Sequence, residues 1–188
     1  MMVFPHLTTV DEFVAWEDAQ ERKFEFADGS ISPFPGGTLR HEIIVANLIA
    51  ALHHHLGAGR VRGSGLKTLT RSSSRYPDVS VSHAADAPID GVEQTFARHP
   101  LLVIEVLSPS TQSVDRGPKF DEYRSIATLR EYVLIDSRKR WAQTARRNGD
   151  DWVVSLPLTA GELTFASVGC TLCIDIVYAG SGLDFFAS

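Results

Sequence analysis

The sequence lacks the features that mark secreted, disulfide-stabilised and membrane proteins. Its 188 residues include two cysteines, too few for a disulfide framework, which fits a reducing compartment. No apolar run approaches the roughly 20 residues that a transmembrane helix needs. The N-terminus has no basic segment followed by a long apolar stretch, so we expect no signal peptide. These absences predict a cytoplasmic protein without a membrane segment.

An excess of basic residues is also missing. The formal net charge is -5, which disfavours a protein that coats nucleic acid. Two segments nevertheless contain basic residues and no acid, and their members are Arg60, Arg62, Lys67, Arg71 and Arg75, then Arg138, Lys139, Arg140, Arg146 and Arg147. They are either two strands with solvated outer faces or two basic edges around a negatively charged substrate.

Length and composition predict one domain, residues 1–188, with a sizeable core, because 44% of the residues are hydrophobic and 22% are charged. A capping box formed by Thr9 and Glu12 begins a short helix that extends to about residue 18. Asp28–Gly29 is the expected turn of a hairpin. A longer helix is predicted over residues 38–56.

The rest of the chain reads as strands around one helix. We expect strands in 61–70, 76–82, 101–107 and 131–136, a helix from 115 or 116 to 126, loops at 71–75 and 83–99, and a hairpin turning near 148–149. This order predicts an α/β domain with a central mixed sheet flanked by helices, and with N-terminal and C-terminal hairpins.

A carboxylate interrupts the most apolar of these strands. Glu105 lies within "LLVIEVL", where an ionised side chain needs a cation, a metal or strong hydrogen-bond donors beside it. Asp78 lies near the end of another strand, and if the strands are neighbours the two carboxylates converge. Two ionised carboxylates at close range repel unless a divalent cation lies between them. Mg²⁺ bound by one or two carboxylates, water and a substrate phosphate would satisfy this pattern.

The helix that follows this strand carries three polar side chains on one face. Asp115, Lys119 and Tyr123 are spaced four residues apart, so they point in one direction. Lys119 is then expected to point back toward Glu105. It either orients an attacking water and stabilises charge on a phosphate, or forms a buried ion pair without catalysis. The spacing leaves both roles open.

Several of these segments together resemble a known family. They are "RYPDVSVS", "LLVIEVLSPST" and "DRGPKFDEYRSIATLREYVLID", with "KFEFADGSI", "GGTLRHEIIVANLIAALHHHL" and "RVRGSGLKT" upstream. They are similar to the Uma-two family of restriction-endonuclease-like proteins, which belongs to the PD-(D/E)XK nuclease superfamily. The resemblance spans residues 5–140. It implies a mixed sheet flanked by helices and a divalent-metal phosphodiesterase site.

The resemblance also implies roles for particular residues. The Pro-Asp element falls on Pro77–Asp78, and the second acidic metal ligand falls on Glu105. The lysine of the superfamily is expected two residues after that acid, where this chain has Leu107. Lys119 is our choice for its replacement, with Lys67 as the second candidate.

Three further positions of the resemblance bear on the site. His41 is expected to relay a proton or hold a phosphate, and Glu25 is expected to reach the metal through water. Gly65 stands where relatives often carry an acidic residue, which is a departure from the family pattern.

These expectations favour a Mg²⁺- or Mn²⁺-dependent endonuclease that hydrolyses phosphodiester bonds in nucleic acid, with DNA preferred to RNA. A homodimer would suit the cutting of two strands. One alternative is a catalytically inactive nuclease fold that serves as a binding module, with Glu105 held by Lys119. Another is a hydrolase of small nucleotides. Fold resemblance does not decide among them.

Overall fold

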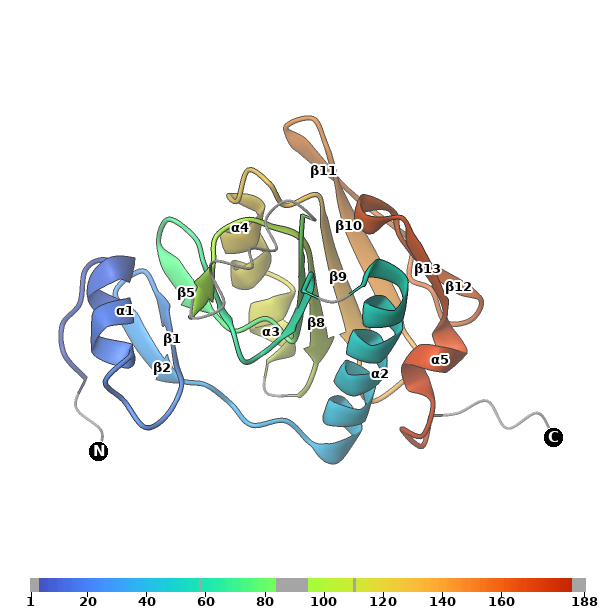
Figure 1. The fold of residues 1–188 in the computed structure, drawn as a ribbon, viewed down its shortest axis with the longest axis horizontal. Helices are drawn as coiled ribbons and strands as arrows, with labels where there is room; N and C mark the ends of the chain where they lie inside the picture. The colour runs from blue at the N-terminus through green and yellow to red at the C-terminus, as the bar shows by residue number, and fades with distance from the viewer. Residues whose placement is uncertain (1–3, 58, 84–94, 110, 184–188) are drawn as a thin grey trace.

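The computed structural model describes residues 4–57, 59–83, 95–109 and 111–183. Within these residues the main helices and short helical turns are α1 (Val10–Glu17), α2 (Leu39–Leu56), α3 (Gln112–Asp115), α4 (Pro118–Arg124), η3 (Ala166–Val168) and α5 (Ile174–Tyr178). A large sheet occupies the centre, and a smaller sheet with α1 lies at one end (Figure 1).

The central sheet has the order β11-β10-β9-β8-β6-β3. Its strands are β3 (Val61–Gly63), β6 (Val79–Ser82), β8 (Pro100–Leu107), β9 (Glu131–Asp136), β10 (Ala142–Asn148) and β11 (Asp151–Val154). β8 and β9 are parallel, whereas every other pairing in this sheet is antiparallel. The predicted mixed sheet is therefore confirmed.

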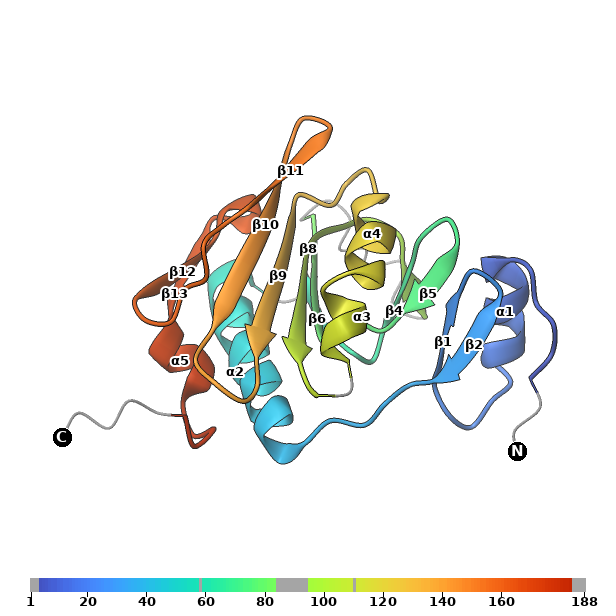
Figure 2. The same cartoon turned by 180° about the vertical axis from the view of Figure 1, so that it is seen from behind.

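Helices cover both faces of the central sheet, as predicted (Figure 2). On one face α2 buries Ile44, Leu48 and Leu52, which recur every four residues and form one apolar stripe. The hairpin of β12 (Glu162–Phe165) and β13 (Cys170–Cys173) and helix α5 complete that layer. On the opposite face Tyr123 of α4 and the following Leu129 pack against β8 and β9.

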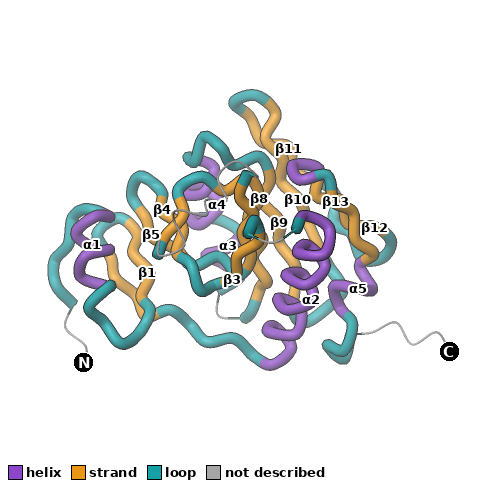
Figure 3. The backbone as a smooth tube through the Cα atoms, viewed as in Figure 1, coloured by secondary structure: helices purple, strands orange, loops and turns teal. Residues whose placement is uncertain are grey.

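The smaller sheet has the order β2-β1-β5-β4-β7. Its strands are β1 (Phe24–Ala27), β2 (Ser30–Pro33), β4 (Lys67–Leu69), β5 (Ser73–Arg75) and β7 (Phe96–Ala97). The capping box of Thr9 and Glu12 begins α1 as expected, and the ring of Phe13 stacks on Phe26 of β1. Figure 3 shows β1, β4 and β5 between α1 and β8, so the smaller sheet lies between α1 and the central sheet.

Three details of the predicted element order were wrong. The helix expected from 115 or 116 to 126 is shorter, because α4 covers only Pro118–Arg124 and the non-helical backbone of Gly117 separates it from α3, which ends at Asp115. The strand expected over 61–70 divides at a turn into β3 and β4, which belong to different sheets. The loop expected at 71–75 contains β5, which pairs with β1 and β4.

The loop predicted at 83–99 lies mostly outside the described residues, although its last part forms β7. Both hairpins predicted from the sequence are present, as β1–β2 and β10–β11. In the described part of the chain, no helix combines the length and hydropathy needed to cross a membrane.

Candidate active site

Asp78 and Glu105 come together because their strands are neighbours. β6 and β8 pair antiparallel with Val79 opposite Ile104, so Asp78 and Glu105 occupy the next position of the same register. Both residues are buried, at 8% and 2% exposure. The Asp78 carboxylate accepts a hydrogen bond from the backbone N–H of Val106, with 2.7 Å between Oδ2 and N. The backbone of β8 therefore holds Asp78 against the residue that follows Glu105.

His41 approaches Asp78 from the first turn of α2. Thr38 caps this helix and accepts a hydrogen bond from the backbone N–H of His41. The ring of His41 then has Nε2 3.2 Å from Asp78 Oδ2 and Nδ1 3.2 Å from Glu42 Oε1. Burial lowers the pKa of His41, but the hydrogen bonds and charges of Asp78 and Glu42 together outweigh burial, so the pKa is raised from its usual value.

Lys119 lies among the carboxylates of Asp115, Glu105 and Glu25. Its Nζ is 3.1 Å from Asp115 Oδ1, 3.4 Å from Glu105 Oε1 and 3.6 Å from Glu25 Oε1. Tyr123 also donates its hydroxyl to Glu105, at 3.2 Å. The predicted common face of residues 115, 119 and 123 thus survives the break between α3 and α4, and Lys119 reaches Glu105.

Glu25 belongs to the same buried network but is fully engaged. Its Oε2 accepts a hydrogen bond from Arg75 at 3.0 Å, and its Oε1 accepts one from the backbone N–H of Tyr76 at 3.2 Å. Arg75 also makes a bidentate pair with Glu122, at 2.6 and 2.7 Å. Glu25 therefore connects β1 to Arg75 and Lys119, and its predicted contact to a metal through water stays a prediction.

A pocket of about 50 Å³ opens beside these groups. Its wall includes His41, Asp78, Glu105, Asp115 and Lys119. A site of about 10–15 Å³ holds one water molecule, so this pocket has room for a few waters or a hydrated ion but not for a nucleotide. The pocket is therefore large enough for an ion beside one phosphate group, both in contact with protein side chains.

The pocket carries more negative than positive charge. Burial, together with the charges of Asp115, Asp78 and Glu25, raises the pKa of Glu105 well above its ordinary value, although Lys119 opposes the shift. Burial likewise raises the pKa of Asp115, again against the effect of Lys119. Lys119 is thus the shared cation of Glu25, Glu105 and Asp115, and a further cation would reduce the repulsion among these carboxylates.

The donor set fits a hard divalent cation such as Mg²⁺ or Mn²⁺. The described residues contain no group of three or more His, Cys, Asp or Glu side chains arranged to hold a metal by themselves. Mg²⁺ seldom uses such a closed cage, and it commonly takes one or two carboxylates together with water and substrate phosphate. Asp78 and Glu105 would be the two carboxylates of such a site, and the surplus negative charge around Lys119 would favour a dication.

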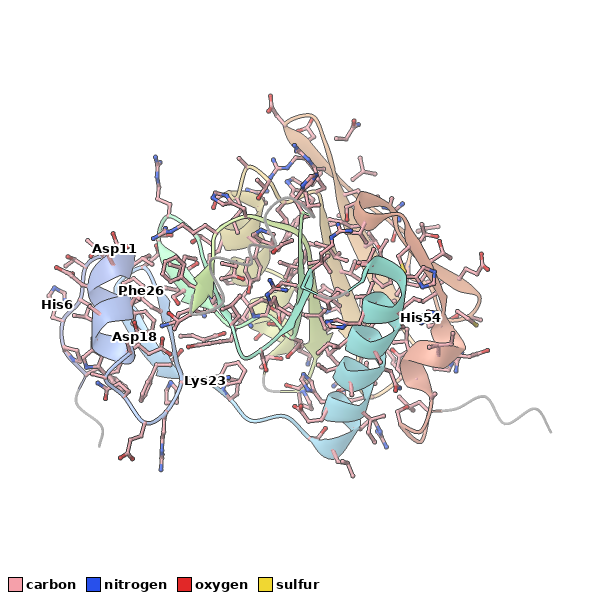
Figure 4. All side chains as sticks on the ribbon, viewed as in Figure 1. His6, Asp11, Asp18, Lys23, Phe26 and His54 are labelled. Atoms are coloured by element: carbon pink, nitrogen blue, oxygen red, sulfur yellow. The ribbon has the colours of Figure 1, made fainter. Side chains whose placement is uncertain are left out.

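The second lysine candidate lies elsewhere. Lys67 Nζ is 2.7 Å from Glu17 Oε2 and 2.8 Å from Asp18 Oδ1. Asp18 lies at the end of α1, beside the smaller sheet (Figure 4). Lys67 is therefore a structural cation between β4 and α1, and among the two candidates only Lys119 borders the pocket.

Half of the basic residues in the two segments are paired with acids of the protein. Lys67 and Arg75 are buried with acids, Arg138 pairs with Asp136, Arg140 with Asp175, and Arg146 with Glu131. Internal ion pairs thus occupy much of the basic charge, which leaves less of it available as an anion-binding surface.

Sequence reasoning did not assign three features in and around the pocket. Asp115 was noted for its spacing but not as a site residue, whereas Arg75 and Glu122 are 47 residues apart and gave no local signal. Gly37 is a third feature, because a Cβ there would lie 2.8 Å from His41 Nδ1 and even closer to the Glu42 carboxylate. A Cβ at Gly65 would meet open space among the described atoms, so the departure there is not imposed by crowding.

Comparisons with known proteins agree with this architecture. The model of the Uma2 family, described as "Putative restriction endonuclease", matches residues 10–168. The uncharacterized protein slr1290 of Synechocystis sp. is 35% identical over 182 residues, which cover 94% of each chain. The uncharacterized protein sll1609 of the same organism is 30% identical over 154 residues, 79% of this chain and 86% of that one.

A solved structure shows the same fold. It is the crystal structure of a "putative nuclease belonging to DUF820" from Anabaena variabilis, with a TM-score of 0.74 and 20% sequence identity. The match covers 90% of this chain and 97% of that chain. With the family model spanning most of the sequence and two relatives aligned over most of their length, the chain belongs to the Uma2 family of restriction-endonuclease-like proteins.

Proposed function

We propose that this protein is a metal-dependent nuclease that hydrolyses phosphodiester bonds in nucleic acid, with DNA as the expected substrate. The observation that carries the proposal is the buried surplus of carboxylates around Lys119, at a pocket sized for a phosphate and an ion. The descriptions of the family and of the structural neighbour support the same class of reaction.

Each side chain of the pocket has a chemical role in this proposal. Asp78 and Glu105 would hold the divalent ion, which polarises a phosphate and lowers the pKa of a bound water. Lys119 would orient the attacking water and stabilise negative charge on the phosphate. His41, in the wall of the pocket, would relay a proton or hold a phosphate oxygen. Asp115 and Glu25 would hold Lys119 in place.

A second candidate function is a binding module that has kept the fold without catalysis. The contact between Lys119 Nζ and Glu105 Oε1, at 3.4 Å, favours this alternative, because the lysine already partly neutralises the carboxylate. The two candidates differ in whether the site needs a metal. They also differ in the effect that replacing Lys119 or Asp78 has on cleavage.

Cleavage assays test the proposal. Labelled single- and double-stranded DNA and RNA, and the small diester bis(p-nitrophenyl) phosphate, are incubated with Mg²⁺ or Mn²⁺ and the parent, Asp78→Asn, Lys119→Met or Lys139→Met. We expect the parent and the exposed-lysine control Lys139→Met to cleave polymers, and the two site variants to lose activity by about 10²–10³-fold.

The other outcomes separate the alternatives. Failure of the parent to cleave any substrate with either ion would overturn the proposal in favour of the binding module. Cleavage of the small diester without cleavage of polymers would favour the hydrolase of small nucleotides. A homodimer also stays a prediction, and light scattering after size-exclusion chromatography would measure it.

A further inference from the structure

A second hollow adjoins the active-site pocket at the start of α2. We call it the α2 groove, and it has a volume of about 610 Å³. Its lining includes Leu39 and Arg40 of α2, Pro109, Arg138 and the turn at 180–182. Ligand sites typically measure about 300–1,000 Å³, so the α2 groove has room for a nucleotide that the active-site pocket lacks.

The active-site pocket and the α2 groove are lined by neighbouring residues of the same two chain segments. Arg40 of the α2 groove directly precedes His41 of the pocket, and Pro109 of the groove directly follows Ser108 of the pocket. Because both hollows lie at the start of α2 and just after β8, one polymer bound across these segments would contact both.

The groove also lies where α/β sheets commonly bind ligands. Pro109 follows the last residues of β8, and Arg138 follows those of β9. These two strands are parallel, so their carboxyl ends lie together at one edge of the sheet. Crevices outside the carboxyl ends of such strands are the usual ligand sites of open α/β sheets.

The side chains of the groove suit a nucleotide. Leu39 is 78% exposed, which is unusual for a large apolar side chain and offers a surface for a base or sugar. Arg40 Nε donates to the Ser181 carbonyl at 3.0 Å, and no carboxylate of the described residues lies within ion-pair distance of its guanidinium. Arg138, by contrast, is held by Asp136 at 3.2 Å and by Gln112 at 2.9 Å. Arg40 is thus oriented by one hydrogen bond and retains donors for an anion.

We propose that the α2 groove binds the nucleotide adjacent to the scissile phosphate, with that nucleotide's own phosphate against Arg40 and its base or sugar against Leu39. The inference rests on the proposed nuclease function, because it places a neighbouring residue of the same substrate. It adds a chemical class of ligand and two specificity-determining side chains that lie outside the pocket.

The test measures binding in EDTA, where metal-dependent cleavage is suppressed. Fluorescence anisotropy of a labelled DNA oligonucleotide gives Kd as a function of salt for the parent, Arg40→Gln, Arg40→Lys and Leu39→Asp. Arg130→Gln and Val153→Asp are matched controls. Arg130 is exposed at the opposite end of β9, and Val153 is 57% exposed on β11. Thermal unfolding confirms that each variant is folded.

Losing one phosphate contact should reduce the slope of log Kd against log salt by about 0.7–0.9. We therefore expect Arg40→Gln to weaken binding by roughly 5- to 10-fold with this smaller slope, and Arg40→Lys to restore the slope. Leu39→Asp should weaken binding roughly 10-fold, whereas the two controls match the parent. In cleavage assays KM should rise for Arg40→Gln while kcat changes less than about twofold.

Two results would overturn the inference, and they are distinguishable. If the parent binds and cleaves DNA while Arg40→Gln and Leu39→Asp keep its affinity and salt slope, the groove does not hold the substrate and the nuclease function stands. If the parent neither binds nor cleaves DNA, the inference falls together with the proposed function.

Discussion

Replacing Glu105 with glutamine should stabilise the metal-free protein. The change removes one negative charge, and the amide oxygen of glutamine still accepts the Tyr123 hydroxyl, which is 3.2 Å from Glu105 Oε1. Lys119 does not lose its partners, because Asp115 at 3.1 Å and Glu25 at 3.6 Å remain. The variant therefore relieves repulsion among carboxylates without leaving a buried cation alone.

The expected magnitudes depend on which charge remains uncompensated. Removing one surplus carboxylate charge from a buried site should raise the free energy of unfolding by about 1–2 kcal/mol. Lys119→Met instead leaves three carboxylates without their shared cation, and should lower it by about 3–5 kcal/mol. For a chain of this length each kcal/mol moves Tm by about 2–4 °C, so both effects are measurable.

The effect should depend on pH in a defined direction. Because the fold raises the pKa of Glu105, its protonated form is favoured, and the stability that this form contributes at acidic pH is lost as pH rises through the raised pKa. Glutamine does not titrate, so the advantage of Glu105→Gln should vanish below the ordinary carboxyl pKa of 4.5 and grow toward alkaline pH.

Urea unfolding followed by circular dichroism in EDTA, from acidic to mildly alkaline pH, measures this difference. Loss of about 3 kcal/mol or more in Glu105→Gln at pH 8 would refute the reasoning, because it would mean that Glu105 and Lys119 form a simple ion pair. A difference that does not change with pH would refute the assigned charge state.

Four further predictions concern neighbouring groups. Gly37→Ala places a Cβ 2.8 Å from His41 Nδ1 and should lower cleavage by about 10²-fold with little change in Tm. Arg75→Met removes the cation of Glu122 and leaves Glu25 with Lys119 alone, and should cost about 3–5 kcal/mol of stability, measured by urea unfolding. In metal-free protein, the pKa of His41 measured by NMR titration should be lower in Asp78→Asn than in the parent. Because the fold raises this pKa, protonated His41 stabilises the parent below the usual pKa of 6.5, and that stability is lost as pH rises through the raised pKa. This pH-dependent stability should be smaller in Asp78→Asn. Lys67→Met should reduce Tm while its folded fraction cleaves at the rate of the parent.

The residues predicted to converge were those with a strong local pattern. Glu105 stands out because an acid within an apolar strand needs a partner, and Asp78 was expected to meet it because it lies near the end of a second strand. Once β6 and β8 are neighbours, register alone brings the two acids together. The spacing of Lys119 and Tyr123 likewise predicted that both would face Glu105, and each contacts it.

The details that sequence reasoning missed depend on long-range pairing. Ser73–Arg75 has weak strand propensity, and it becomes β5 because β1 and β4 offer hydrogen bonds on both sides. The sequence did not separate Lys67 from Lys119 because the acids that hold Lys67, Glu17 and Asp18, belong to the distant α1 region, with Asp18 49 residues away. The break at Gly117 was hidden because a glycine and a proline suit the first turn of one helix as well as the junction of two.

The most direct test of the central claim is calorimetric titration of Mn²⁺ into the parent, Asp78→Asn and Glu105→Gln, with a phosphorothioate dinucleotide present to complete the coordination shell. The account predicts saturable binding to the parent that is abolished in both variants, since each loses one of the two proposed carboxylate ligands. Equal binding by all three proteins, or no binding by any of them, would contradict it.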